Sequence, residues 1–133
     1  MLVIDKMSRK PIYEQIVEGI EREIVTGLIG ERDQLPSIRE LSAILGTNPN
    51  TIQKAFLDLD RAGVIVSTPG RGCFVAEGAV ARIRQRLIAR ITQIGDMASE
   101  LANAGIDVEL VISAVRSAYE ACGSETERKE ARK

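Results

Sequence analysis

The sequence contains no histidine and no tryptophan among its 133 residues, and it has only two cysteines, two tyrosines and two phenylalanines. Without histidine, it lacks the general base of Ser-His-Asp hydrolases and a frequent zinc ligand. Cys73 and Cys122 lie far apart and form no CxxC spacing, so we interpret them as reduced, partly buried thiols without a function. We therefore predict that the protein is not an enzyme and has neither a metal site nor a cofactor.

Long apolar segments are also absent. No apolar run approaches the ~20 residues that span a bilayer, and residues 1–6 lack the apolar core of a signal peptide. These features predict a cytoplasmic protein with no membrane partner. The formal net charge of −1 is not that of a globally basic nucleic-acid-binding protein, so any DNA-binding surface has to arise from a local cluster of charge.

The segment from Leu35 to Val75 has the pattern of a helix-turn-helix followed by a hairpin. In its first helix, Ser37 and Glu40 have the spacing of a capping box, which predicts that the helix begins at about Ser37. Gly46 supplies the left-handed residue that ends it. Apolar residues at three- and four-residue spacing predict the buried face: Ile38, Leu41, Ile44 and Leu45.

The second helix of the pattern begins at Asn48 and Pro49, an N-cap side chain followed by the residue suited to the first helical position. Gly63 ends it, and its buried stripe consists of Ile52, Ala55, Phe56 and Leu59. Its outer face begins with short polar or cationic side chains, namely Asn50, Thr51, Gln53 and Lys54. Amide side chains can pair with adenine edges in the major groove, and threonine can contact phosphate or a thymine methyl group. We therefore interpret it as a DNA-recognition helix.

A hairpin is predicted after this helix, with strands at 64–66 and 73–75 joined by a turn over residues 68–72. Arg71 lies at the tip of the turn, where it can contact a phosphate or enter a minor groove. The backbone of Gly70 can approach DNA closely there.

A further helix is predicted before the helix-turn-helix, from Pro11 to about Thr26. Its apolar stripe consists of Tyr13, Ile16, Val17, Ile20 and Ile24, and Gly27 ends it. Three helices and a hairpin are the parts of a winged helix, which we predict over residues 1–76. A basic patch is expected on this domain, because it contains Arg39, Lys54, Arg61 and Arg71.

Three stretches at these spacings together resemble the DNA-binding domain of GntR-family bacterial transcription regulators: PIYEQIVEGIEREIVTG, LPSIRELSAILGTNPNTIQKAFLDLDRAGVI and PGRGCFV. The resemblance covers roughly residues 9 to 76. It implies that Arg39 contacts DNA at the start of the second helix and that Gly70 and Arg71 are wing contacts. The recognition-helix contacts that it implies are Asn48, Asn50, Thr51 and Gln53. Some relatives have arginine where this chain has Pro49, which implies that the bases read differ from theirs.

Beyond the wing, an amphipathic pattern runs from Ala79 to Gly105, and a second one begins at Asp107. We predict that they form an antiparallel hairpin over residues 77–123. A lone hairpin leaves its apolar seam exposed, so a second copy of the chain is expected to cover it. The residues assigned to this dimerisation surface are Ile83, Leu87, Ile91, Ile94, Leu101, Val108, Val111, Ile112, Val115 and Tyr119. The charged tail, residues 124–133, is predicted to be disordered.

The predicted fold is therefore mainly α with a small β wing, an N-terminal winged helix-turn-helix followed by a two-helix dimerisation hairpin. A two-fold dimer presents two recognition helices, which predicts a repressor that binds a palindromic operator in double-stranded DNA. The short C-terminal region resembles the YtrA-like subfamily of GntR regulators, and this resemblance implies control of transporter genes. A small-molecule effector between the C-terminal helices is compatible with the pattern, but no polar cluster there identifies its chemistry.

The sequence leaves alternatives open for several of these assignments. A winged helix can also serve as a protein–protein interaction module that does not bind DNA. Arg39 can form an ion pair within its helix, Lys54 can pair with Asp58, and Arg71 can be a solvated loop charge. The basic series at the start of the C-terminal region is interpreted as a solvated face whose end near the wing can touch phosphate: Arg82, Arg84, Arg86 and Arg90.

Overall fold

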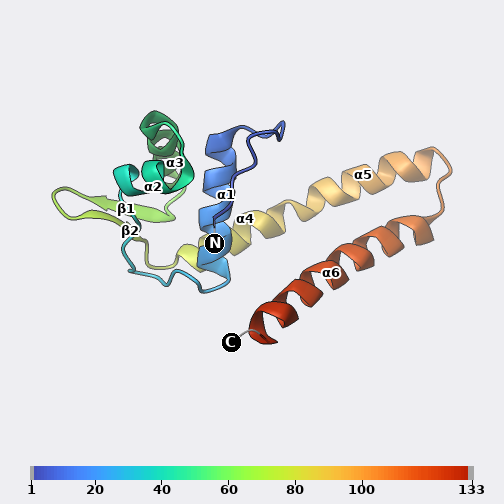
Figure 1. The fold of residues 1–133 in the computed structure, drawn as a ribbon. Coiled ribbons are helices and arrows are strands. Elements are labelled where there is room, and N and C mark those ends of the chain that lie inside the picture. Colours follow the sequence, from blue (N-terminus) through green and yellow to red (C-terminus); the bar gives the residue numbers. More distant parts are fainter. Residues whose placement is uncertain (1, 132–133) are drawn as a thin grey trace. The chain divides into compact units, whose positions relative to one another are not determined.

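The computed structural model describes the backbone of residues 2–131 and their side chains up to residue 123. The elements assigned to these residues are α1 Ile12–Val25, α2 Ile38–Leu45, α3 Pro49–Arg61, β1 Ile65–Thr68, β2 Gly72–Val75, α4 Ala79–Ala89, α5 Ile91–Asn103 and α6 Val108–Ala131 (Figure 1). The chain divides into two compact units, Met1–Ile88 and Ala89–Lys133. The first unit is a winged helix, as predicted.

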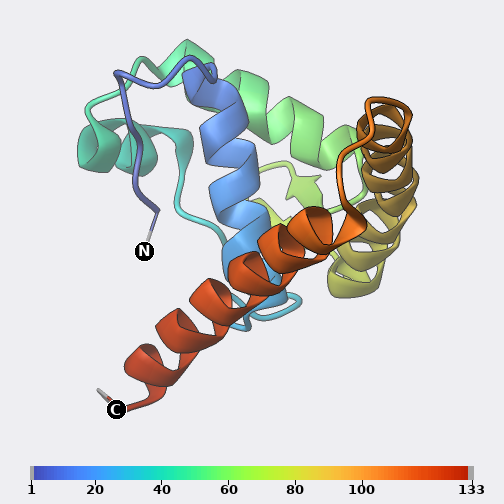
Figure 2. The same cartoon turned by 90° about the vertical axis from the view of Figure 1, so that its right-hand side faces the viewer.

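α1 packs beside α3 in the N-terminal unit, as Figures 1 and 2 both show. Ile16, Ile20 and Ile24 recur every four residues on α1, and all three are buried in one core with the apolar stripe of α3. Burying an isoleucine side chain contributes about 1.5–3 kcal/mol, so this stripe fixes the position of α3. Gly27 follows the helix with a φ of 84°, which confirms it as the residue that ends α1.

The caps of α2 and α3 agree with the prediction. The Ser37 hydroxyl accepts a hydrogen bond from the Glu40 backbone N–H at 3.1 Å, and Gly46 ends α2 with a φ of 61°. Asn48 caps α3 through its side-chain oxygen, which accepts from the Asn50 N–H at 2.9 Å, and Pro49 occupies the first turn. The helix-turn-helix is thus built by local signals in the sequence.

Ile44 does not belong to the buried face of α2, and that prediction was wrong. Its side chain is 72% exposed, whereas Leu41 is buried. At 100° per residue, Ile38, Leu41 and Leu45 fall within a narrow arc of the helix, and Ile44 lies beyond its edge.

The wing is a two-stranded antiparallel sheet in which Ile65 pairs with Val75 and Thr68 with Gly72. Its strands lie close to the predicted ones. The segment before α2 runs alongside β2 through three backbone hydrogen bonds, from Arg32 N to Val75 O at 2.9 Å, from Val75 N to Asp33 O at 2.9 Å and from Leu35 N to Cys73 O at 2.8 Å. β2 is therefore hydrogen-bonded along both edges, to β1 on one side and to residues 32–35 on the other.

α4 belongs to the N-terminal unit. The predicted helix from Ala79 to Gly105 is divided at Arg90 into α4 and α5. Ile83, assigned from the sequence to the dimerisation surface, is only 1% exposed and lies in the core with Ile16, so that assignment was wrong. Because α4 inserts Ala79 and Ile83 into this core, the first unit extends to Ile88, beyond the boundary predicted at residue 76.

In the C-terminal unit, α5 and α6 are joined at Gly105, whose φ is 77°. The two helices diverge from this connection instead of packing along an antiparallel seam (Figure 2). α5 has no buried residue, and large apolar side chains of both helices are exposed, including Met97 at 65% and Tyr119 at 78%. Within the described residues of this unit, α5 and α6 thus leave large apolar side chains exposed.

α6 takes in residues beyond 123, where the sequence predicts a disordered tail. Side chains from residue 124 onward and residues 132–133 lie outside the described part of the chain, so the predicted disorder of the tail stays a prediction. Within the described residues, no helix has the length and apolar character to cross a membrane.

Candidate nucleic-acid interface

The first turns of α3 present polar side chains to solvent. Asn50, Gln53 and Lys54 are exposed, and Thr51 is half-buried. On the opposite face Ile52, Ala55 and Phe56 are buried in the core, which prevents α3 from turning these polar groups inward. The amides of Asn50 and Gln53 form no hydrogen bonds within the described residues and remain available to an external partner.

Asn48 is exposed, and one of its side-chain polar groups is engaged in capping α3. Its side-chain oxygen caps α3 by accepting from Asn50 N, and the side-chain NH2 group stays available as a donor. This geometry limits Asn48 to donating hydrogen bonds to an acceptor such as a phosphate or a base edge.

Lys54 does not pair with Asp58. Its ammonium nitrogen lies 3.9 Å from the centroid of the Tyr13 ring, a cation–π contact between α3 and α1. The Tyr13 hydroxyl donates to a Glu14 carboxylate oxygen at 3.2 Å. This hydrogen bond and the nearby negative charge of Glu14 raise the pKa of Tyr13. The ring therefore holds Lys54 at the side of α3 in a defined position.

Arg39 is exposed at the start of α2 and forms no ion pair or hydrogen bond through its guanidinium within the described residues. The intrahelical ion pair proposed as its alternative is therefore absent from this part of the chain. The Arg39 guanidinium can therefore bind an anion such as a phosphate.

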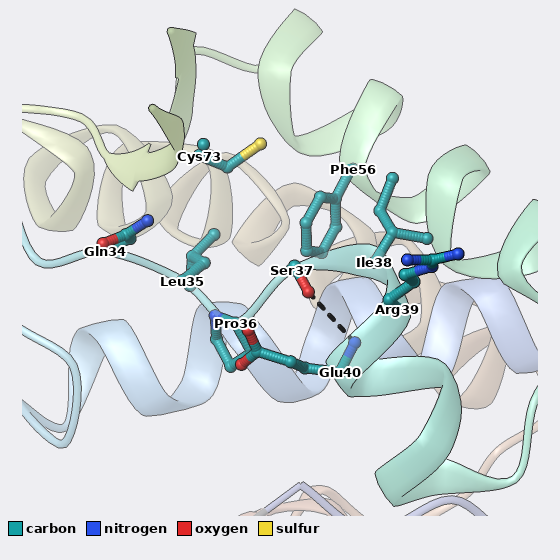
Figure 3. A pocket seen from close by; sticks show the side chains of 10 residues that line it. Gln34, Leu35, Pro36, Ser37, Ile38, Arg39, Glu40, Phe56 and Cys73 are labelled. Carbon is teal, nitrogen blue, oxygen red and sulfur yellow. Dashed lines mark hydrogen bonds between the residues drawn. The ribbon is translucent and has the colours of Figure 1, made fainter. Parts of the chain in front are cut away.

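An open cavity of about 670 Å³ lies between the start of α2, α3 and the wing (Figure 3). Leu35, Ile38 and Phe56 supply apolar walls, and Arg39 and Gln34 supply polar groups. Its walls come from the three elements that carry the predicted DNA contacts. The described residues contain no group of three or more histidine, cysteine, aspartate or glutamate side chains that could hold a metal ion.

The tip of the wing is shaped by two glycines in the left-handed region. Gly70 has a φ of 76° and Gly72 a φ of 114°, and the Arg71 N–H closes the turn by donating to Thr68 O at 3.0 Å. The Arg71 side chain is exposed and has no partner in the described part of the chain. Apart from its chain neighbours, no described residue lies within 4 Å of the position that a Cβ of Gly70 would take, so the backbone is open to a close approach.

Two contacts near these residues have no local signal in the sequence. The Lys6 ammonium donates to Gly46 O at 3.2 Å, which places the N-terminal segment at the turn of the helix-turn-helix. The Gln34 amide donates to Arg71 O at 2.9 Å. Both join residues more than 35 positions apart, where helical or strand periodicity predicts nothing.

Two arginines of the basic series after the wing have partners within the N-terminal unit. Arg82 donates to the backbone oxygens of Gly63 at 2.8 Å and Glu77 at 3.0 Å, and Arg86 forms an ion pair with Glu21 of α1. These two arginines bind α4 to the winged helix. All four arginines are exposed, in keeping with the interpretation as a solvated face, but Arg82 and Arg86 also have partners in the N-terminal unit.

Most residues of the predicted dimerisation surface are accessible. Val111 and Ile112 are half-buried, and the exposed members are Leu87, Ile91, Ile94, Leu101, Val108, Val115 and Tyr119. Their role in dimerisation stays a prediction.

The chain is similar in sequence and fold to known transcription regulators. Residues 12–75 match the family described as bacterial regulatory proteins, gntR family. The HTH-type transcriptional repressor YtrA of Bacillus subtilis (strain 168) is 36% identical over 110 residues, which cover 82% of this chain and 85% of that protein.

Two solved structures of transcription regulators are also similar to this chain. A GntR family transcriptional regulator from Listeria monocytogenes has 34% identity and a TM-score of 0.69 over 86% of this chain and 98% of that one. A crystal structure of AraR(DBD) in complex with operator ORX1 has 35% identity and a TM-score of 0.51 over 56% of this chain and 93% of that one. The match to AraR is to a DNA-binding domain bound to its operator.

Proposed function

The chain belongs to the GntR family of bacterial regulatory proteins, and we propose that it is a homodimeric transcription repressor that binds a palindromic operator. The observation that carries the proposal is the set of polar and cationic side chains of α2, α3 and the wing that have no partner among the described residues. Asn50 and Gln53 project from the helix, and Arg39 and Arg71 stand exposed on the neighbouring elements. We place the protein in the cytoplasm, where it has access to chromosomal DNA.

In this proposal the N-terminal half of α3 enters the major groove. Asn50 and Gln53 offer a donor and an acceptor together and can read adenine, and Thr51 contacts phosphate or a thymine methyl group. Asn48 donates through its NH2 group, and Lys54, held against the Tyr13 ring, contacts the backbone beside the groove.

The arginines and the wing supply the sequence-independent part of binding. Arg39 at the start of α2 and Arg71 at the wing tip neutralise phosphates, and the Gly70 backbone lies close to the DNA. A chain with a net charge of −1 can bind a polyanion in this way, because the exposed cations Arg39, Lys54 and Arg71 belong to the elements that face the DNA in this proposal.

Dimerisation is proposed through the C-terminal unit. Its exposed apolar side chains, such as Ile91, Ile94 and Leu101, form the kind of surface that a second copy covers. A two-fold axis between the copies presents two α3 helices, which have to lie about 34 Å apart, one turn of DNA, to enter successive major grooves. The resemblance to YtrA-like regulators supports transporter genes as targets, which transcript profiling of a deletion strain would test.

Selection of bound sequences from random duplex DNA tests the function directly. We expect an enriched motif with inverted repeats whose centres are separated by about one helical turn. Enrichment of no motif would refute sequence-specific binding, and a single asymmetric site would refute the dimeric arrangement. The mass of the free protein and of the complex, measured by light scattering, checks the dimer independently.

The alternative of a protein-binding module receives little support from α3. Among its described residues, Leu57 is the single large apolar side chain that is exposed, and it lies one turn after Gln53 on the same face of the helix, without exposed apolar neighbours on α3 that would make a cluster. Protein interfaces usually centre on a cluster of apolar and aromatic side chains. The reading face of α3 suits nucleic acid better.

A further inference from the structure

We infer that Gln34 is a positioning residue that holds the wing tip, and Arg71 with it, in the orientation used for DNA binding. The inference rests on the proposed function but adds a residue to it. Gln34 lies outside α2, α3 and both strands of the wing, in the segment that leads into α2.

The Gln34 side chain fixes the peptide group at the tip of the wing. Its amide nitrogen donates to Arg71 O at 2.9 Å across 37 positions of sequence. The Arg71 N–H donates to Thr68 O at 3.0 Å, so both backbone polar groups of Arg71 are bonded. The Arg71 guanidinium has no partner among the described residues, while its backbone is hydrogen-bonded at both the N–H and the carbonyl.

The Gln34 side chain extends the support of the wing beyond its base. Backbone hydrogen bonds join Asp33 to Val75 and Leu35 to Cys73, and Gln34 forms a bridge with Phe74. These bonds end short of the turn. The Gln34 amide is the contact that reaches the turn from this segment, and Figure 3 shows it on the side of the cavity where the wing lies.

Gly72 makes room for this contact. Its φ of 114° is strained for residues with a side chain, and a Cβ at this position would lie 2.9 Å from the Gln34 amide nitrogen. The glycine therefore serves both the turn and the close approach of Gln34.

The physical benefit is preorganisation. A two-stranded hairpin is marginally stable alone, so an unsupported tip samples many orientations and loses that freedom when it binds. One hydrogen bond that removes this freedom beforehand corresponds to about a three- to tenfold gain in affinity.

Gln34→Met tests the inference, because methionine has a similar length and no charge but cannot donate a hydrogen bond. The matched control is Gln85→Met, the same change at an exposed position of α4. Amide ¹⁵N relaxation of the DNA-free protein should show order parameters at Gly70 and Arg71 falling from about 0.85 to below about 0.6 in Gln34→Met alone. Unchanged order at the tip would overturn the inference whether or not the protein binds DNA.

A double-mutant cycle then tests whether Gln34 acts through Arg71. The probe is a labelled duplex recovered by selection from random DNA. Gln34→Met should weaken binding about three- to tenfold in the wild-type background and have no effect in Arg71→Ala. An equal loss in both backgrounds would overturn the positioning role. If the wild type selects no duplex, the proposed function fails, and the relaxation result still decides whether Gln34 orders the wing.

Discussion

Removing the charge at the wing tip should lower the salt dependence of DNA binding by a predictable amount. The Arg71 side chain is exposed and unpaired within the described residues, so Arg71→Ala removes one available cation per chain without breaking an internal ion pair. The turn itself depends on Gly70 and Gly72 and on backbone bonds, which alanine at position 71 leaves in place.

The size of the effect follows from counterion release. Each neutralised phosphate contributes about 0.9 to the slope of log affinity against log salt concentration, so two wings in a dimer contribute about 1.8. Doubling the salt concentration should therefore weaken the wild type about threefold more than Arg71→Ala. The loss should be similar on operator and random DNA, because a phosphate contact carries no base information.

Fluorescence anisotropy of a labelled duplex, titrated between about 0.05 and 0.2 M salt, measures this slope. Arg22→Ala is the matched control, since Arg22 is an exposed arginine of α1 that lies outside the predicted basic patch. An unchanged slope in Arg71→Ala, or an equal decrease in Arg22→Ala, would refute the assignment of Arg71 to a phosphate.

Three further outcomes are expected. Gln53→Ala should cost about 1–3 kcal/mol on the operator and relax preference at one base pair, and equal losses on random DNA in a competition assay would contradict base reading. Ile83→Ala should lower the free energy of unfolding by about 2–5 kcal/mol in urea denaturation, because Ile83 lies in the core. Ile94→Asp should dissociate the dimer in light scattering while the winged helix stays folded, because it places a charge on the proposed dimer surface. The reverse pattern would contradict the assignment of Ile83 to the core and Ile94 to the dimer surface. In an absorbance titration, with Tyr13→Phe as the reference, Tyr13 should ionise above its ordinary pKa of 10.0, and Glu14→Gln should lower the pKa of Tyr13. Because folding raises this pKa, the interaction of the protonated Tyr13 with Glu14 stabilises the fold at neutral pH. That stabilisation is lost as the pH rises through the folded-state pKa.

The uncovered faces of α5 and α6 have a consequence for how the protein is handled. Side chains such as Ile91, Leu101 and Val115 are exposed in the single chain, and an uncovered surface of this kind favours association. On the proposed dimer, thermal stability should rise with protein concentration, because assembly stabilises the folded state by mass action.

The sequence by itself determined the elements whose signals are local. Ser37, Gly46, Asn48 and Pro49 mark the ends of α2 and α3 because caps act within one turn of helix, and their observed bonds match the prediction. The exposed polar face at the start of α3 could also be predicted from local sequence, because the apolar residues of this helix repeat at helical spacing and occupy the opposite face.

The tertiary structure alone decided where the long-range contacts fall. The helical spacing of apolar residues predicts that Ile83 is buried but not which element packs against it. In the fold, Ile83 lies in the winged-helix core. Lys54 over the Tyr13 ring and Gln34 on the Arg71 carbonyl likewise join residues that are distant in the chain. Such pairs arise only when separate elements pack together, because the distance between them is set by the whole core and not by neighbours in sequence.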